Sequence, residues 1–374
     1  MTGQSRRVLF PFSGETVGGS HVSALTLVGG LADTGWEPVV GVHQPGGLLS
    51  DYLDTLGQPW IALPDLALPT MGSLRRQAPV FARATWPLCS LLRAQGIGIV
   101  HTNDIRMHQL WGLPARLAGA THLWHQRTPT RNRRLDAYAR LATRVATVSD
   151  YCRGELPPRL RGKAVVVTNP VILPEPPDRA AARTRLLEAL GRPDAGPVIG
   201  FVSNITERKR PLAMVALASA LRAAGHADAV FPMFGDARPP TGPELDAAIS
   251  GAGLQGTVVP MGPRFPIEPW LAGCDILIAP ARREAFGRTL VEAMLCGTAV
   301  IASDEGGHRE IVDHGRTGLL VPPDDPPALE AAARQLLADP ATMHGIAEAA
   351  RSEAEARYGL PAHVAAITAL YARG

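Results

Sequence analysis

The chain has 374 residues, of which 46% are apolar and 19% charged, so it has enough apolar material for two ordinary cores and too much for a disordered protein. Its four cysteines are scattered, without the spacing of a metal site or of a disulfide-rich secreted domain. No apolar stretch approaches the length of a membrane span, so we expect a cytosolic protein with two domains of roughly 150 to 200 residues each.

Short apolar runs alternate with helical patterns through the first half of the chain, which predicts a doubly wound α/β sheet. The expected strands are residues 8–12, 37–42, 98–101, 122–125, 145–148 and 164–167. Parallel strands of this kind place their ligand-binding side chains in the loops at their carboxyl ends.

The loop after the first expected strand carries a glycine pair, Gly18 and Gly19, just before a helical pattern that begins near His21. Glycines at such a place let another group come close to the backbone. Their spacing fits neither the dinucleotide fingerprint nor the Walker loop, which needs a lysine after its last glycine. The residues alone therefore leave an ordinary turn and a ligand-binding loop both open.

His125 ends one of the expected strands, where the ligand sites of open α/β sheets form. A single histidine at this position is also compatible with a purely structural role. His101, at the end of the preceding strand, is a weaker candidate of the same kind.

Positive charge is concentrated in the first half of the chain. Residues 1–170 carry 18 basic and 10 acidic residues, a net charge of +8, and the other 19 basic and 24 acidic residues give −5. Ten of the cations fall between residues 127 and 163, among them Arg131, Arg133 and Arg134. Such a surface attracts anions or an anionic membrane, although a solvated helical surface gives the same pattern. Nucleic acid is not expected, because no stacking aromatics are interleaved with the cations.

A proline-rich segment, residues 169–178, predicts an extended link between the two halves. We therefore assign residues 1–169 to an N-terminal domain and 170–357 to a C-terminal domain. The second half repeats the alternation of strands and helices, and it ends in a helical stretch at 361–372. Its expected strands are residues 197–202, 229–234, 257–261, 275–279, 299–302 and 318–321.

Lys209 follows the first expected strand of the second half and precedes a helix, where a phosphate could be held. The chain has 35 arginines and only one other lysine, Lys163, so a compact point charge at this place is unusual for it. Chance placement is the alternative. Arg208 and Arg210 flank the lysine and add positive charge to the loop.

Glu284 and Glu292 lie eight residues apart at a strand-to-helix crossing. The helix start leaves backbone N–H groups unpaired and carries a partial positive charge, so the amides of Gly287, Arg288 and Thr289 are placed to receive a phosphate oxygen. Glu292 could accept two hydrogen bonds from a ribose diol, and Glu284 could reach the hydroxyls of a sugar. The segment therefore indicates a nucleotide-sugar ligand, although acidic residues also occur in first helical turns because they complement the helix dipole.

Residues 280–321 strongly resemble glycosyltransferase family 4, whose members have the GT-B fold of two Rossmann-like doubly wound domains facing a cleft. The family pattern has a proline, a glutamate, a Phe-Gly pair, a second glutamate before Ala-Met, and a Gly-Gly pair with a glutamate three further. These elements are present as Pro280, Glu284, Phe286-Gly287, Glu292-Ala293-Met294, and Gly306-Gly307 with Glu310.

The resemblance implies a retaining hexosyltransferase of the cytoplasm that takes a hexose-type sugar from a UDP- or GDP-linked donor. The donor is a co-substrate, and no separate cofactor or metal is expected. The acceptor would be a glycan, a glycolipid or a small molecule, as in polysaccharide biosynthesis. The basic first domain could contact the inner face of the membrane. The resemblance also implies that the last helix, within residues 358–374, crosses back onto the first domain.

The resemblance assigns site residues by position. The glycine pair would lie near the donor diphosphate and the acceptor, His125 would face the transferred sugar, Glu284 would orient that sugar, and Lys209 would hold the diphosphate. The expected catalytic residues are His125, Glu284 and Lys209. The expected donor-binding residues are Gly18, Gly19, Asn204, Arg208, Lys209, Phe286, Gly287, Arg288, Thr289 and Glu292.

The chain departs from the family pattern at Asn204. The family has an arginine in a Gly-Arg-Leu triplet five residues before the lysine, and Ser203-Asn204-Ile205 replaces that triplet here. An amide cannot supply the missing charge, so Arg208 or Arg210 is expected to substitute. Two alternatives stay open: a nucleotide-sugar binding subunit that needs a partner, which Asn204 favours, and a non-hydrolysing sugar-nucleotide epimerase of the same fold, which would need further acid and base carboxylates.

Overall fold

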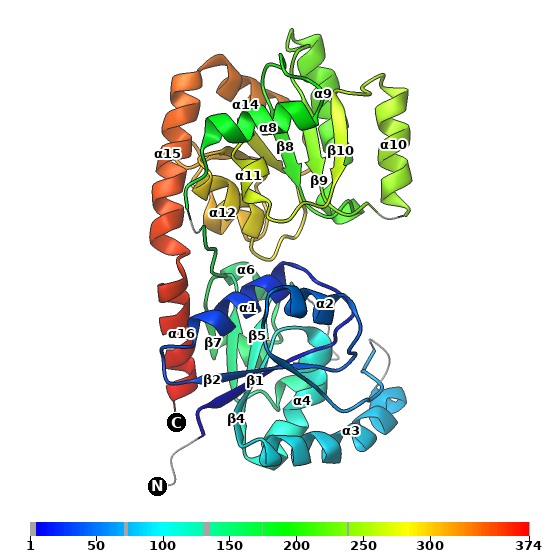
Figure 1. Cartoon of the computed structure of the whole chain (residues 1–374), viewed down its shortest axis with the longest axis vertical. Coiled ribbons are helices and arrows are strands. Elements are labelled where there is room, and N and C mark those ends of the chain that lie inside the picture. The colour runs from blue at the N-terminus through cyan, green and yellow to red at the C-terminus, as the bar shows by residue number, and fades with distance from the viewer. Residues whose placement is uncertain (1–4, 71–73, 130–134, 174, 238, 374) are drawn as a thin grey trace. The chain divides into compact units, whose positions relative to one another are not determined.

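A computed structural model of the chain describes residues 5–70, 74–129, 135–173, 175–237 and 239–373 (Figure 1). The chain divides into two compact units, one made of Met1–Pro170 with Leu360–Gly374 and the other of Val171–Gly359. Three arginines of the basic surface predicted from the sequence, Arg131, Arg133 and Arg134, lie outside the described residues.

The first unit contains a seven-stranded sheet in the order β3-β2-β1-β4-β5-β6-β7, and all its strand pairs are parallel. The strands are β1 (Arg7–Phe12), β2 (Glu37–Val42), β3 (Trp60–Ala62), β4 (Ile97–Thr102), β5 (Thr121–Gln126), β6 (Arg144–Thr147) and β7 (Ala164–Val166). The helices are α1 (Gly19–Gly30), α2 (Leu48–Thr55), α3 (Leu74–Ala94), α4 (Ile105–Ala118), α5 (Leu135–Ala139), α6 (Asp150–Glu155), α7 (Pro158–Arg161) and α16 (Leu360–Ala372).

Helices cover both faces of this sheet, because successive side chains of a strand point to opposite faces. On β1, Phe10 packs with residues of α1, α2 and α16, whereas Leu9 packs with residues of α3 and α4. The last helix approaches α1 closely, since a Cβ built on Gly30 would lie 2.8 Å from Val364 Cγ2. The C-terminal residues therefore complete the core of the N-terminal unit.

The second unit contains a six-stranded parallel sheet in the order β10-β9-β8-β11-β12-β13. The strands are β8 (Ile199–Val202), β9 (Phe231–Phe234), β10 (Val258–Gly262), β11 (Ile276–Ala279), β12 (Ala299–Ser303) and β13 (Leu319–Val321). The helices are α8 (Arg179–Ala189), the 3₁₀ turn η1 (Glu207–Lys209), α9 (Leu212–Ala223), α10 (Thr241–Gly251), α11 (Glu268–Leu271), α12 (Arg288–Leu295), α13 (His308–Ile311), α14 (Pro326–Ala338) and α15 (Pro340–Arg357).

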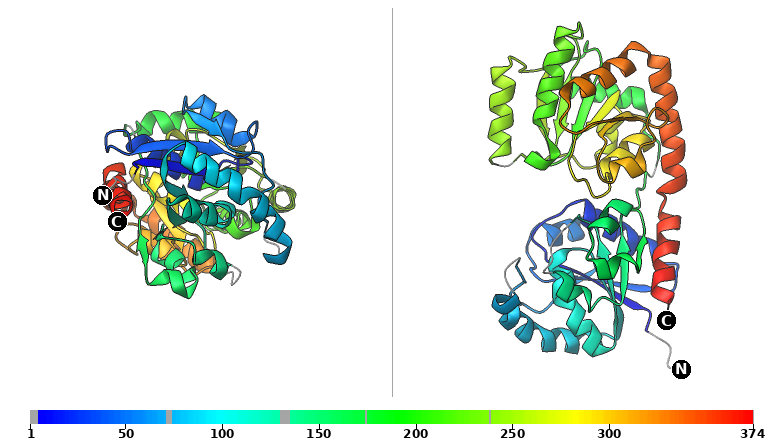
Figure 2. Two further views of the ribbon diagram at one scale, coloured as in Figure 1. Left: turned by 90° about the horizontal axis from the view of Figure 1, so that it is seen from below. Right: turned by 180° about the vertical axis from the view of Figure 1, so that it is seen from behind.

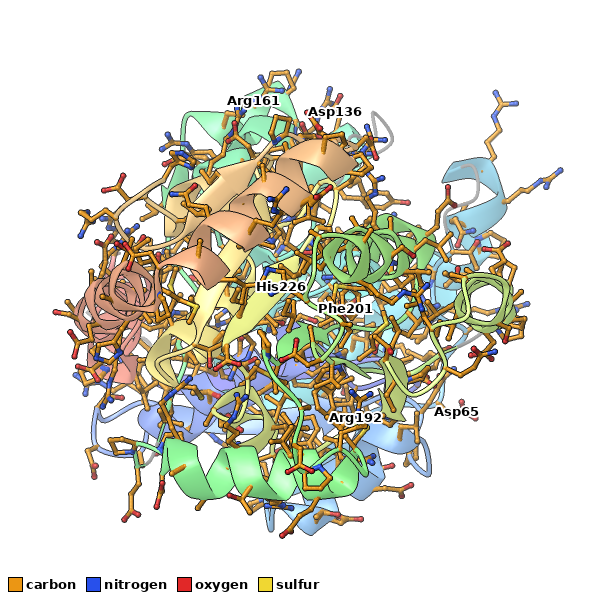
Figure 3. The ribbon with its side chains drawn as sticks, turned by 90° about the horizontal axis from the view of Figure 1, so that it is seen from above. Asp65, Asp136, Arg161, Arg192, Phe201 and His226 are labelled. Atoms are coloured by element: carbon orange, nitrogen blue, oxygen red, sulfur yellow. The ribbon has the colours of Figure 1, made fainter. Side chains whose placement is uncertain are left out.

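This sheet is also packed on both faces, as the two further views show (Figure 2). Phe201, which Figure 3 labels, is 1% exposed in the larger core with residues of α9, α10, α14 and α15. The preceding Val198 belongs to a smaller core with residues of α8 on the opposite face. Two doubly wound parallel sheets confirm the predicted α/β class.

Each sheet has one place where the strand order reverses. In the first unit it lies between β1 and β4, and in the second between β8 and β11. Loops at the carboxyl ends of the two central strands diverge there and leave room for a ligand. Within the described parts of the chain, every helix is too short or too polar to serve as a transmembrane segment.

Candidate functional site

The predicted site residues of the second unit gather at its point of strand reversal. Lys209 and Arg208 lie in the loop after β8, and Glu284 lies in the loop after β11. The two loops are joined through the backbone, because the Arg282 N–H donates to the Arg208 carbonyl at 2.9 Å. This is the position at which open α/β sheets bind their ligands.

Glu284 Oε2 accepts from both cations of the neighbouring loop. Lys209 Nζ lies 2.6 Å from this oxygen and Arg208 Nη1 lies 2.9 Å from it. The carboxylate is only 14% exposed and the lysine 20%, whereas the arginine is 49% exposed. A half-exposed cation and a less exposed ammonium group therefore lie together on one oxygen of Glu284, where an anion could bind both.

The charge state of Glu284 is fixed by these neighbours. Burial by itself raises the pKa of this carboxyl, but the positive charges of Lys209 and Arg208 outweigh it and lower the pKa to about 2. Burial lowers the pKa of the adjacent His308 to about 4. Near neutral pH Glu284 is therefore an ionised acceptor of hydrogen bonds, and it cannot donate a proton.

Two glycines let the loop of Glu284 pack tightly. A Cβ built on Gly306 would lie 2.5 Å from the Glu284 carbonyl oxygen, and one built on Gly307 would lie 2.6 Å from the Ala285 carbonyl oxygen. The Gly307 N–H also donates to the Glu284 carbonyl at 2.9 Å. The Gly-Gly pair therefore has a packing reason, since any side chain there would push the glutamate loop away.

Helix α12 begins directly after this loop. Its N-cap residue, Gly287, has a φ of 109°, a conformation that favours glycine. A Cβ there would also lie 2.9 Å from His308 Cδ2, so backbone conformation and packing explain this glycine without a ligand. Arg288 and Thr289 form the half-buried first turn, as expected. Phe286 is 4% exposed and its ring packs edge-on against Tyr358, so the ring is occupied by packing within the fold.

Glu292 is buried one turn into α12, and its carboxylate already has a partner. Arg288 Nε donates to Glu292 Oε1 at 2.7 Å. Burial is the main cause that raises the pKa of Glu292 to about 6, and the guanidinium of Arg288 opposes this shift. A ribose that reached Glu292 would have to share the carboxylate with this arginine.

The loop after β8 shows which cation stands near Glu284. Asn204 is exposed, and the chain passes close to Gly235, where a Cβ would overlap the Ser203 carbonyl oxygen. Arg210 adopts a positive φ of 57° and forms an ion pair with Asp324. Of the two expected substitutes for the missing arginine, Arg208 therefore lies beside Glu284 and Arg210 is engaged elsewhere.

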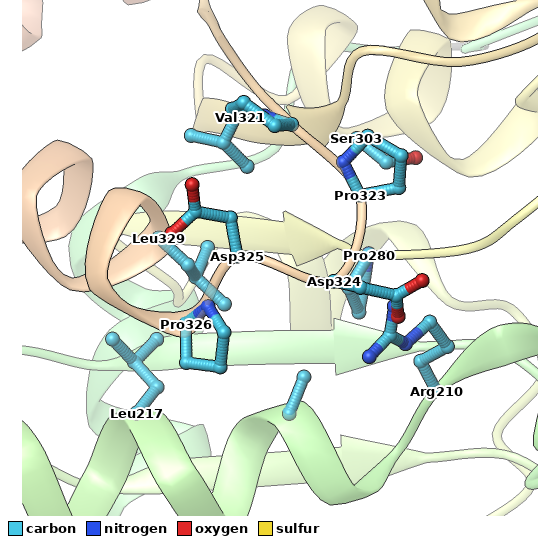
Figure 4. A pocket seen from close by; sticks show the side chains of 12 residues that line it. Arg210, Leu217, Pro280, Ser303, Val321, Pro323, Asp324, Asp325, Pro326 and Leu329 are labelled. Atoms are coloured by element: carbon cyan, nitrogen blue, oxygen red, sulfur yellow. The ribbon is translucent and has the colours of Figure 1, made fainter.

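A pocket beside this loop is lined by Arg210, Asp324 and a row of apolar side chains that includes Leu217, Val321 and Leu329 (Figure 4). Neither predicted glutamate lines it, and Lys209 does not line it either. The pocket therefore lies next to the predicted site without containing it. No group of three or more His, Cys, Asp or Glu side chains is arranged to hold a metal ion within the described ranges.

The glycine pair of the first unit lies at its strand reversal, after β1 and at the start of α1. Gly18 has an extended φ of −153°, and its N–H donates to His21 Nδ1 at 3.2 Å. A Cβ on Gly18 would meet nothing closer than that nitrogen at 4.0 Å. The fold of this unit therefore does not require a glycine at 18, whereas close approach by a ligand would. Gly19 is the first residue of α1.

His125 lies on β5 as predicted, but its side chain is 0% exposed. Its Nδ1 lies 3.1 Å from His101 Nε2 and 3.3 Å from Arg127 Nη2. Burial, with the charge of Arg127 next, holds the pKa of both imidazoles well below the usual value. The histidine is therefore a neutral member of a buried polar network.

Sequence reasoning missed several members of this network. Arg127 donates to Asn103 and Asn169, Tyr371 bonds to His101 at 2.6 Å, and His363 Nδ1 lies 2.7 Å from the Thr168 carbonyl. A signal was present, because His363 and Tyr371 lie eight residues apart on a C-terminal helix whose other residues, apart from Thr368, are apolar. The role of these two residues becomes clear only from their contacts, because Tyr371 bonds to His101 on β4 and His363 stacks near His125 on β5.

Both halves of the chain match models of known glycosyltransferase families. Residues 17–174 match Glycosyltransferase Family 4, and residues 196–339 match Glycosyl transferases group 1. The 2-deoxystreptamine N-acetyl-D-glucosaminyltransferase of Streptomyces fradiae is 29% identical, over 94% of this chain and 90% of that protein. The lipopolysaccharide core mannosyltransferase LpcC of Rhizobium leguminosarum bv. viciae is 36% identical over 34% of this chain and 36% of that protein.

A D-inositol 3-phosphate glycosyltransferase of Xylanimonas cellulosilytica is 32% identical over 54% of this chain. The matches to this protein and to LpcC span about half or less of those relatives' own lengths. Among solved structures, Anabaena HepE in complex with UDP and glucose has a TM-score of 0.82 at 22% identity and covers 98% of this chain and 99% of that one. A glycosyltransferase from Rickettsia africae ESF-5 has a TM-score of 0.84 at 22% identity, covering 99% of this chain and 98% of that one. At identities this low, the similarity to these two solved structures supports the fold alone. The two family matches span most of the chain, and the chain belongs to the family 4 glycosyltransferases with the GT-B fold.

Proposed function

We propose that this protein transfers a hexose-type sugar from a nucleoside-diphosphate sugar to a hydroxyl of a glycan, glycolipid or small-molecule acceptor. The observation that carries the proposal is the arrangement of Lys209 and Arg208 on one oxygen of Glu284, beside the N-terminus of α12. Positive charge at this point suits a diphosphate leaving group, and the adjacent carboxylate suits sugar hydroxyls.

The proposed reaction is metal-independent and retains the configuration at the anomeric carbon. The bond from the anomeric carbon to the β-phosphate oxygen breaks, and a bond from the same carbon to the acceptor oxygen forms. The acceptor proton passes to the departing phosphate. Lys209, Arg208 and the first-turn amides of α12 stabilise the charge that develops on the diphosphate. Glu284 orients the sugar, because its low pKa keeps it ionised.

The donor is proposed to carry UDP or GDP. Anabaena HepE, which shares the fold, was solved with UDP-glucose, and this supports a uridine nucleotide as the first donor to test. The experiment is nucleotide release from a panel of UDP- and GDP-sugars in the presence of chelator, followed by NMR assignment of the product's anomeric configuration. Release with one nucleotide class and a retained configuration is the expected result. Absence of nucleotide release from every donor would overturn the proposal.

We also propose that the first unit contacts an anionic membrane through the outer face of α3 and α4. Trp86 is 72% exposed and Leu117 is 52% exposed, and Arg93 Nη2 donates to the Leu117 carbonyl at 2.7 Å, which joins the two helices. No acidic residue occurs between positions 66 and 103. Exposed arginines on these two helices are Arg75, Arg76, Arg83, Arg93 and Arg116. Exposed tryptophan with surrounding arginine suits an anionic lipid surface.

Sedimentation with vesicles tests this membrane contact. The wild-type chain should bind phosphatidylglycerol vesicles and not phosphatidylcholine vesicles. Removal of one arginine, Arg83→Ser, should weaken binding about fivefold, since each cation near such a surface contributes about 1 kcal/mol. Trp86→Ser should also weaken it, whereas Phe265→Ser, which removes a 75% exposed aromatic of the second unit, should not. Equal binding to both vesicle types would overturn this proposal and favour a soluble acceptor.

A partner-dependent binding subunit is the second candidate, and Asn204 favours it, because the family's arginine is missing there. Asn204→Arg distinguishes the two. If Arg208 already supplies the charge, the substitution should change turnover less than threefold, whereas Arg208→Ala should lower it at least about tenfold. An isolated chain that binds donor but acquires turnover only with Asn204→Arg would support the binding subunit.

A further inference from the structure

A buried chain of hydrogen bonds in the first unit runs from the last helix to a strand end. Tyr371, on α16, lies with its hydroxyl 2.6 Å from His101 Nδ1 on β4. His101 Nε2 lies 3.1 Å from His125 Nδ1 on the neighbouring strand β5. Arg127 Nη2 lies 3.3 Å from the same nitrogen of His125. The tyrosine and both histidines are 0% exposed, and the arginine is 4% exposed.

Each imidazole of this chain carries one proton. Burial holds the pKa of both histidines well below the ordinary value, and the charge of Arg127 lowers it further. Burial likewise raises the pKa of Tyr371 well above that of an ordinary phenol, so the hydroxyl keeps its proton. A neutral imidazole donates from one ring nitrogen and accepts at the other, so the direction of every bond in the chain can be assigned from its partners.

The arginine decides that direction. A guanidinium only donates, so His125 Nδ1 must accept from Arg127 and carries no proton. His101 Nε2 must then donate to the same atom, which leaves His101 Nδ1 as the acceptor for Tyr371. The reverse direction would set a His125 N–H against an arginine N–H. In the first arrangement the two donors share the one lone pair of His125 Nδ1, and no two N–H groups face each other.

We propose that Arg127, His101 and Tyr371 are positioning residues that hold His125 as the tautomer protonated on Nε2. That N–H has no hydrogen-bond partner among the described residues, although the atom is buried. A buried donor without an acceptor destabilises the fold, so its retention fits an acceptor that arrives with the ligand. The matching chemistry is an oxygen with a free lone pair, such as a sugar hydroxyl.

The assignment gives His125 one chemical task, which rests on the transferase function proposed above. Its Nε2 donates a hydrogen bond and cannot take a proton from an acceptor hydroxyl in this tautomer. His363 provides a contrast within the same unit. Its Nδ1 faces the Thr168 carbonyl at 2.7 Å and must donate, so its buried Nε2 is an acceptor without a partner among the described residues. The two histidines thus present opposite hydrogen-bonding groups.

Nitrogen NMR of histidine-labelled protein at neutral pH tests the tautomer directly. His125 should show an unprotonated Nδ1 and a protonated Nε2, and His125→Gln identifies its signals. His344, whose side chain is 74% exposed and whose Nε2 lies 3.2 Å from Glu348 Oε1, serves as the internal reference for a solvent-exposed imidazole. A proton on Nδ1 of His125, or on both nitrogens, would overturn the proposal. The wild-type spectrum decides this question without any variant and without donor or acceptor.

Two variants test the positioning residues. Arg127→Met removes the donor that sets the direction, so His125 should become a mixture of both tautomers. Tyr371→Phe should have a smaller effect, because Arg127 still occupies Nδ1 of His125. A larger change with Tyr371→Phe than with Arg127→Met would contradict the assigned order.

Activity measurements distinguish the roles of the two ring nitrogens of His125. Glutamine at 125 places an amide N–H near the position of Nε2, whereas asparagine places one near Nδ1. His125→Gln should keep at least about tenfold more kcat/KM than His125→Asn, since only the former preserves the unpartnered donor. Equal losses would argue against a donor role. Should the isolated chain transfer no sugar at all, the transferase function fails while the NMR result still decides the tautomer.

Discussion

At the scale of single residues, two cations share one carboxylate oxygen at Glu284. Their side chains are held in place before any donor arrives, so little side-chain freedom remains to be lost on binding. Lys209 is the more buried of the two cations and makes the shorter contact. We therefore expect the loss of Lys209 to weaken binding of the donor diphosphate more than it destabilises the surrounding fold.

Lys209→Met should raise the dissociation constant of the nucleotide-sugar donor by about 10- to 100-fold, because a charge-assisted hydrogen bond to a phosphate contributes about 1.5 to 3 kcal/mol. Isothermal titration with the donor measures this change. Lys163→Met is the matched control, since it removes the chain's other lysine, whose Nζ donates to the Ala142 carbonyl of the first unit. Equal affinities for the two variants would exclude Lys209 from the donor site.

The pKa of Glu292 predicts a specific dependence of stability on pH. Its folded-state pKa is raised from 4.5 to about 6, so the folded chain binds this proton more tightly than the unfolded chain. That contribution is present below pH 4.5 and is lost as the pH rises through 6. Relative to Glu292→Gln, the wild type should lose about 2 kcal/mol of unfolding free energy across this window. Urea denaturation at several pH values measures the difference, and parallel curves for both proteins would contradict it.

Gly307 should tolerate no side chain. Its Cβ would meet the Phe286 Cα and carbonyl oxygen at 2.7 Å, and backbone atoms cannot rotate away. Gly307→Ala should therefore lower the unfolding free energy by about 1 to 3 kcal/mol. Gly345→Ala, within helix α15 and with nothing within 4 Å, should raise it by up to about 1 kcal/mol. Chemical denaturation compares them, and a neutral Gly307→Ala would show that the glutamate loop can move.

The sequence predicted the types of residue at the site better than their partners. Glu284, Lys209 and Arg208 follow neighbouring strands in the expected way, because strand ends can be read from apolar runs. Their common oxygen could not be predicted, because it depends on which strands are adjacent. The pairing of Arg288 with Glu292 could be predicted from the sequence, since residues four apart lie next to each other on a helix.

At the scale of secondary structure, the apolar runs predicted every strand of both sheets except β3. That strand has only three residues, Trp60–Ala62, and lies at the sheet edge, so its sequence carries too short a pattern to recognise. The predicted helix after Gly287 runs over Arg288–Leu295 and stops before Gly297, which has a φ of 69°. Long periodic segments and glycine stops were therefore sufficient for these elements.

Helix α16 should contribute directly to the stability of the first unit. Ile367 is 0% exposed and packs in the same core as Phe10. Ile367→Ala should lower the unfolding free energy by about 2 to 5 kcal/mol. Ile172→Ala is the control, because that side chain is 42% exposed and should cost less than about 1 kcal/mol. Similar effects of the two substitutions in thermal unfolding would mean that α16 is only loosely attached.

At the scale of the whole molecule, each unit has its own apolar core and its own point of strand reversal. Two separate cores predict two unfolding transitions in calorimetry. Gly307→Ala should lower only one of them and so identify the second unit. UDP at about one hundred times its dissociation constant should add about 2.7 kcal/mol to that same transition. A single transition, lowered alike by Gly307→Ala and Ile367→Ala, would show that the units unfold together.

The division of the chain also sets the order in which it can fold during synthesis. The second unit is complete once Gly359 has left the ribosome, but the first unit still lacks the helix that carries Ile367, Leu370 and Tyr371. The N-terminal unit, although made first, must therefore wait for the final residues before its core and its tyrosine contact close. Translation thus reverses the usual sequence in which the first domain made is the first domain finished.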